Sequence, residues 1–149
     1  MNLLHTTVVT DGHVAMGKGN TVMAFTCLAG LPHIRGVSEY DKPLIIGDGN
    51  QIGEHCTLKR GAKIGDRNII MGYVNIGHDV EIGSDCEIGC GVKILGHAKI
   101  GSGVMIKAGA MIRNRIKICS GVIVGMRANV TKDITEVGVY FGNPARKRD

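Results

Sequence analysis

An aliphatic residue recurs at every sixth position along most of this chain. From Ile46 to Val130 the repeat has fifteen members and no exception. They are Ile46, Ile52, Leu58, Ile64, Ile70, Ile76, Ile82, Ile88, Ile94, Ile100, Ile106, Ile112, Ile118, Val124 and Val130. An α-helix turns once every 3.6 residues, so a period of six would spread these side chains around its whole surface. The repeat therefore predicts stacked short strands rather than a helix.

The residues around each aliphatic position complete a six-residue unit. Glycine follows the aliphatic residue directly in eight of the fifteen repeats, as expected where the backbone turns sharply. Two positions before it the residue is mostly small or β-branched: Ala62, Val74, Val80, Cys86, Val92, Ala98, Val104, Ala110, Val122 and Ala128. Cys56 also occupies this small inward position. Hexapeptide periodicity is typical of a parallel β-helix, whose repeats bury their aliphatic side chains by stacking on one another.

The six-residue phase has one interruption and one end. It is present upstream as far as Leu28 and is then lost over residues 29–43, which contain two prolines and are predicted to form a loop excursion. Residues 135–149 abandon the period again and carry the last proline. We therefore expect a single all-β domain, with coils over residues 1–134 and a short C-terminal cap or arm after them.

Composition limits the environment and the partners. The net charge of +5 favours an anionic partner, but a chain with no Trp, two Phe and three Tyr lacks the aromatic platforms of single-strand binders. The chain has no run of about 20 apolar residues, so the sequence predicts no membrane span. Five cysteines without a CxxC pair suit a reducing compartment. We expect a cytoplasmic protein that neither binds nucleic acid nor spans a membrane.

The hexads resemble those of the left-handed parallel β-helix acyltransferases. In that family three hexads make one triangular coil of 18 residues, and three chains associate side by side. The resemblance implies a left-handed helix of about six coils and a homotrimer with its sites between subunits. The segments GDGNQIGEHCTLKRG, NIGHDVEIG and KILGHAKIG are similar to segments of the UDP-N-acetylglucosamine O-acyltransferases, over residues 9–134.

The resemblance assigns a catalytic group. His78 matches the family's general base and Asp79 its partner, while Gly96 matches the glycine whose backbone amide stabilises the oxyanion. His97, nineteen residues after His78, is then one coil and one position further on, where the family holds the acyl donor or acceptor. The chemistry is consistent, because an imidazole with an ordinary pKa of about 6.5 suits a base that deprotonates an attacking hydroxyl or amine.

Further substrate ligands are expected nearby. Asn75 stands where the family has a second histidine shortly before the base. The excursion loop, which handles the nucleotide sugar in the family, offers Arg35 and His33 here. We therefore expect Asn75, Arg35 and His33 to bind the acceptor.

The C-terminal segments IVGMRANVTKDI and GVYFGNPARKR resemble the closing part of coenzyme A-dependent acetyltransferases of this fold. Basic and polar residues in and before these segments are expected to bind the cofactor and its phosphates: Asn114, Arg113, Arg127, Lys132 and Arg146. This predicts an O- or N-acetyltransferase that uses acetyl-CoA or another acyl-CoA on a sugar or nucleotide sugar. Two alternatives remain open: a UDP-sugar O-acyltransferase with an acyl carrier protein as donor, and a β-helix subunit without activity.

No metal is expected. Carbonic anhydrases of the γ class share this fold and bind zinc through three histidines, two of them in an H-x4-H pair. No such pair occurs in this chain, and zinc normally needs three or four convergent ligands.

Overall fold

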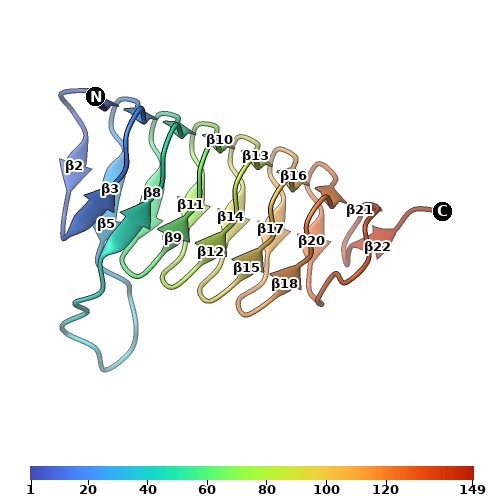
Figure 1. Ribbon diagram of the computed structural model, residues 1–149. Helices are drawn as coiled ribbons and strands as arrows, with labels where there is room; N and C mark the ends of the chain where they lie inside the picture. The colour runs from blue at the N-terminus through green and yellow to red at the C-terminus, as the bar shows by residue number, and fades with distance from the viewer.

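A computed structural model, which describes all 149 residues, shows a prism of stacked coils with strands on three faces (Figure 1). Face A contains β1 (Leu3–Leu4), β4 (Thr21–Val22), β7 (Gln51–Ile52), β10 (Ile69–Ile70), β13 (Glu87–Ile88), β16 (Met105–Ile106), β19 (Ile123–Val124), β21 (Val139–Phe141) and β22 (Arg146–Lys147). Face B contains β2 (Val9–Thr10), β5 (Cys27–Gly30), β8 (Thr57–Lys59), β11 (Asn75–Ile76), β14 (Lys93–Ile94), β17 (Met111–Ile112) and β20 (Asn129–Val130). Face C contains β3 (Val14–Met16), β6 (Leu44–Ile46), β9 (Lys63–Ile64), β12 (Glu81–Ile82), β15 (Lys99–Ile100) and β18 (Lys117–Ile118).

The strands confirm a parallel β-helix of hexapeptide repeats. Neighbouring strands on each face pair in parallel with residues eighteen apart in register, as Ile76 with Ile94 and Ile82 with Ile100. Counted along face A, seven coils are present and β21 begins an eighth, which is more than the six predicted. The additional turns come from β1 to β3 at the N-terminus and from the C-terminal β21.

The predicted excursion is confirmed. After β5 the chain leaves the prism over residues 31–43 and returns at β6, forming the loop that hangs away from the coils in Figure 1. The spacing changes accordingly, because Leu28 pairs with Leu58, thirty residues later, instead of the usual eighteen. Everything after the loop then continues in the original phase.

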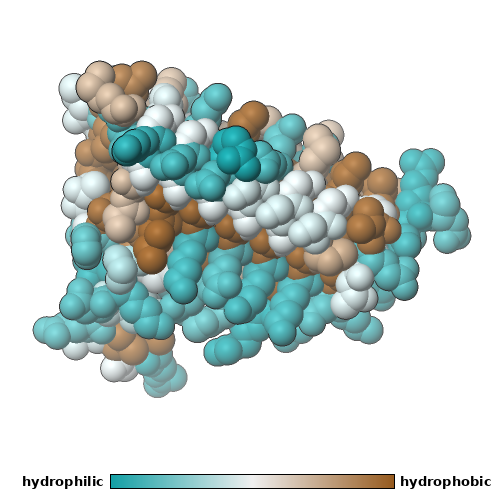
Figure 2. Space-filling view, viewed as in Figure 1, coloured by the Kyte–Doolittle hydropathy of each residue, from teal (hydrophilic) through white to brown (hydrophobic).

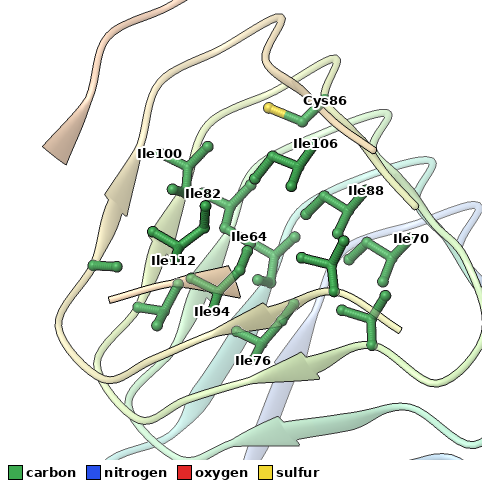
Figure 3. Close-up of a cluster of buried hydrophobic side chains, with 14 of the residues drawn as sticks. Ile64, Ile70, Ile76, Ile82, Cys86, Ile88, Ile94, Ile100, Ile106 and Ile112 are labelled. Atoms are coloured by element: carbon green, nitrogen blue, oxygen red, sulfur yellow. The ribbon is translucent and has the colours of Figure 1, made fainter. Parts of the chain in front are cut away.

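The aliphatic stripe forms the core. All fifteen members of the repeat are buried, and Figure 3 shows isoleucines from successive coils stacked inside the prism. Cys56 and Cys86 are buried at the small inward position, and burial raises the pKa of both thiols. With about 4.8 Å between coils, side chains of one column contact the coil above and the coil below.

Three asparagines also occupy the inward column at the corner between faces C and A. The Asn68 N–H donates to Asn50 Oδ1 (2.9 Å), and the Asn50 N–H donates to Asn20 Oδ1 (2.8 Å). The side-chain amide of Asn50 also donates to the Gly65 carbonyl at 2.9 Å. No buried side-chain polar atom lacks a partner, so this ladder satisfies the polar groups that it buries.

The C-terminal segment closes one end of the prism. β21 pairs in parallel with β19, and β22 returns antiparallel to β21 at the edge of face A. The structure contains no helix long and apolar enough to cross a bilayer.

Candidate active site

The candidate base lies in a turn at the corner between faces B and C, which we call the B–C corner. Its turns contain residues 60–62, 77–80, 95–98, 113–116 and 131–133. Neighbouring residues on a strand point to opposite faces, but Asp79 adopts a left-handed backbone with φ of 55° and bends the chain. His78 Nδ1 therefore lies 2.9 Å from Asp79 Oδ2.

His97 lies one coil away and contacts the same pair. Its N–H donates to the His78 carbonyl (3.0 Å), and the two imidazole rings meet edge-on with centroids 4.9 Å apart. His97 Nε2 is 3.9 Å from Asp79 Oδ2. The nineteen-residue spacing thus brings the two histidines and the carboxylate into one cluster.

Gly96 leaves the second nitrogen of His78 open. A Cβ at Gly96 would lie 2.7 Å from His78 Nε2, closer than unbonded atoms approach. The Gly96 N–H donates no hydrogen bond within the chain. The residue against which His78 Nε2 lies thus has a backbone N–H without an acceptor in the chain. That this N–H stabilises an oxyanion stays a prediction.

Gly96→Ala is expected to lower kcat at least tenfold, because the added methyl group displaces the His78 ring from its position over Gly96. Steady-state kinetics of the acyl transfer that the sequence predicts measures the change. Gly72→Ala is the matched control: it occupies the equivalent turn position at the corner between faces A and B, and its Cβ would approach no atom closer than 3.3 Å. Equal losses in both variants would contradict a special role for Gly96.

Two residues of the excursion loop reach Asp79. Lys42 Nζ lies 2.9 Å from Asp79 Oδ1, and the Tyr40 hydroxyl donates to Asp79 Oδ2. Sequence reasoning missed both, although their place just before the return to β6 was a signal that they lie near the B–C corner. Arg35 and His33 belong to the same loop but form no hydrogen bond or ion pair with the cluster, so their role as ligands stays a prediction.

These contacts determine the protonation of the cluster. Partial burial alone would raise the pKa of Asp79, but hydrogen bonds from Tyr40, His78 and Lys42 outweigh burial and hold this pKa well below its ordinary range. Burial lowers the pKa of His97 by more than the Asp79 carboxylate raises it. At neutral pH Asp79 is therefore ionised and His97 is uncharged.

The predicted cofactor ligands fall into two groups. One group lies in the next two turns of the B–C corner and contains Arg113, Asn114 and Lys132. The first of these turns is bonded to the cluster, because the Arg115 N–H donates to the Gly96 carbonyl (3.0 Å). Arg127 and Arg146 are elsewhere, in a turn between faces A and B and on β22. Asn75 is half-buried on β11, outside the hydrogen bonds of the cluster.

The cluster also contains the candidate metal ligands of the chain. These are His78, Asp79 and His97, whose donor atoms lie within 4.8 Å of one another. Both oxygens of Asp79 already accept hydrogen bonds, one of them from the Lys42 ammonium, which repels a cation. This donor set does not favour a metal ion. That no metal takes part in the reaction stays a prediction.

A groove extends from the cluster along face C. One hollow of about 400 Å³ is lined by Lys42, Asp79 and His97 together with Lys63 and Lys99. A second, of about 720 Å³, shares those last two lysines and Glu81. It runs over face C at the level of Ile64, Ile82, Ile100 and Ile118, whose side chains are almost entirely buried in the core beneath it. Figure 2 shows hydrophilic side chains over the face C strands β9, β12, β15 and β18, beside a strip of hydrophobic residues.

Known proteins match both the repeat and the whole fold. The family described as "Bacterial transferase hexapeptide (six repeats)" matches residues 61–96. An acyl-[acyl-carrier-protein]–UDP-N-acetylglucosamine O-acyltransferase from Aliarcobacter butzleri is 31% identical over 137 residues, covering 87% of this chain and 53% of the relative. The crystal structure of a UDP-N-acetylglucosamine acyltransferase is 30% identical, with a TM-score of 0.93 over 99% of this chain and 60% of that one.

A perosamine N-acetyltransferase from Caulobacter crescentus is more distant. Its structure, with CoA and GDP-perosamine, has a TM-score of 0.65 and 22% identity over 99% of this chain and 56% of that one, a likeness in fold alone. The chain spans between about a third and just over half of the curated relatives that it matches first.

The repeat, the coils and these relatives together define a hexapeptide-repeat β-helix protein of the acyltransferase family. Within that family the chain resembles the UDP-N-acetylglucosamine O-acyltransferases, in sequence and in structure.

Proposed function

We propose that this protein transfers an acyl group from the thioester of an acyl carrier protein to a hydroxyl of a UDP-sugar. The observation that carries the proposal is the orientation of His78. Its Nδ1 faces Asp79 at 2.9 Å, while its Nε2 is left open by Gly96. An ionised carboxylate only accepts hydrogen bonds, so Nδ1 carries the hydrogen and Nε2 has the free electron pair that a general base needs.

The steps follow from this arrangement. His78 Nε2 takes the proton of the sugar hydroxyl while its oxygen attacks the thioester carbonyl carbon. The negative charge that develops on the carbonyl oxygen is stabilised by the free Gly96 N–H. When the tetrahedral intermediate collapses, the carbon–sulfur bond breaks and the imidazolium returns the proton to the sulfur. The products are the ester and the free thiol, and His97 holds one substrate from the neighbouring coil.

The relatives favour a carrier protein over acetyl-CoA as the donor. The curated relatives that match the chain first bear the carrier protein in their name, whereas the CoA-binding acetyltransferase shares the fold only. The groove gives independent support. It follows four coils, a length that suits an extended acyl or pantetheine chain. Lysines 42, 63, 99 and 117 lie along it, and although Lys42 pairs with Asp79 and Lys99 with Glu81, the lysines outnumber these acidic residues and favour an acidic carrier.

The site also suggests an assembly. The groove on face C is open to one side in a single chain, and we include in the proposal that a homotrimer, with neighbouring chains closing the sites, is the active form. The cytoplasm is the compartment in which such donors and nucleotide sugars would meet the protein.

A donor comparison tests the proposal. Purified protein is incubated with UDP-N-acetylglucosamine and either acyl carrier proteins with acyl chains of several lengths or acetyl-CoA, and the products are identified by mass spectrometry. We expect the acyl-sugar mass with a carrier-protein donor and none with acetyl-CoA. Product from acetyl-CoA alone would support the acetyltransferase prediction instead, and no product from any donor or sugar nucleotide would support a β-helix without activity.

A further inference from the structure

Residues of the excursion loop contact the candidate base His78 and its partner Asp79. The Tyr40 hydroxyl donates to Asp79 Oδ2, which is the same oxygen that faces His78 Nδ1. The tyrosine ring also meets the His78 imidazole edge-on, with centroids 6.0 Å apart and planes at 69°. Lys42 occupies the other carboxylate oxygen at 2.9 Å. Both oxygens of Asp79 are thus held by donors from one loop.

The loop is attached to the prism where these contacts are made. Arg60, in the turn directly before the cluster along the B–C corner, donates through Nη1 to the Tyr40 carbonyl at 3.2 Å. The Gly61 N–H lies 3.2 Å from the Lys42 carbonyl. At the other end, Lys59 Nζ donates to the Leu31 carbonyl at 3.0 Å. The backbone at residues 40 and 42 is therefore fixed by the same coil that precedes the base.

We propose that Tyr40 is a positioning residue for the base, an inference that rests on the proposed function. Tyr40 holds the Asp79 carboxylate in the plane that accepts the His78 Nδ1 hydrogen, and so keeps the electron pair on Nε2, toward Gly96. The hydroxyl does not touch the reacting atoms. Without it Asp79 Oδ2 loses one of its two donors, the carboxylate rotates more freely, and the other imidazole tautomer becomes populated.

Nitrogen NMR of the imidazole tests the proposal without any substrate. Protein with ¹⁵N-labelled histidine is examined at about pH 8.5, roughly two units above the ordinary histidine pKa. The His78 signals are assigned by their loss in His78→Gln. In the wild type we expect the tautomer with hydrogen on Nδ1, and in Tyr40→Phe a measurable population with hydrogen on Nε2. Asp79→Asn should shift the population further, which calibrates the measurement.

Kinetics provides the second readout. In Tyr40→Phe we expect kcat to fall about tenfold with little change in KM, the size expected for a lost hydrogen bond to a charged group. Tyr73→Phe is the matched control, because Tyr73 is exposed and stacks on His55 at another corner. An unchanged tautomer population in a folded Tyr40→Phe protein would overturn the proposal. That result is independent of whether the protein proves to be an acyltransferase, since the NMR measurement needs no turnover.

Discussion

Replacing His78 with glutamine is expected to lower kcat by about 10²- to 10⁴-fold, the usual contribution of a positioned general base. Glutamine has similar length and retains a hydrogen-bond donor and acceptor, but it has no nitrogen that takes up a proton near neutral pH. KM for the acceptor should change little, because the change removes a group needed in the transition state rather than a ligand of the ground state. Turnover with the donor identified by the comparison above measures the effect.

The matched control is His55→Gln. His55 stands in a turn of the preceding coil, at the corner between faces A and B and away from the cluster, where it stacks between Phe25 and Tyr73. We expect this variant to keep at least half of the wild-type kcat. A His78→Gln protein that is folded and retains more than about a tenth of the wild-type kcat would contradict the assignment of the base.

The dependence of stability on pH reports the contacts of Asp79. The pKa of Asp79 is held below its unfolded value of about 3.9 by Tyr40, His78 and Lys42, against the effect of burial. The stabilisation from these contacts is therefore fully present above about pH 4 and is lost as the pH falls through the lower folded pKa. Between pH 5 and 9 Asp79 does not titrate, so a change of rate in that range reports another group.

The repeat carried most of the fold prediction. A column of aliphatic residues at period six leaves few arrangements open, and the excursion loop was recognisable because Leu44 and Ile46 resume the phase after it. The same arithmetic placed His97 against His78. It also separates the predicted cofactor ligands, because Asn114 and Lys132 lie eighteen and thirty-six residues after Gly96, whereas Arg127 is out of phase with that corner.

The six-residue period could not predict the contacts made by the excursion loop, because the loop has no repeat. Tyr40 and Lys42 are in the loop, and their distance from Asp79 is determined by hydrogen bonds to Arg60 and Gly61 rather than by spacing. The handedness of the helix came from the family resemblance alone. Where polar residues enter the inward column, as at Asn50, only the structure shows how the coil satisfies them.

Ile70→Asp is expected to cost more than about 5 kcal/mol in the free energy of unfolding. Ile70 is 1% exposed and its column is packed on both sides by neighbouring coils. The substitution removes a buried side chain, which alone costs about 2–5 kcal/mol, and adds a carboxylate that must be charged without a partner or protonated in an apolar site. Because domains of this size are stable by only about 5–15 kcal/mol, the substitution should remove at least about a third of the total stability.

The neighbouring residue provides a control of the same type. Ile69 is in the same strand, β10, but points outward and is 43% exposed. Circular dichroism and urea unfolding of both variants should show Ile69→Asp within about 1 kcal/mol of the wild type and Ile70→Asp less stable by more than about 5 kcal/mol, or already unfolded without urea. Since the two positions differ only in the face to which the side chain points, similar stability in both variants would mean that the buried isoleucine column does not hold the coils together.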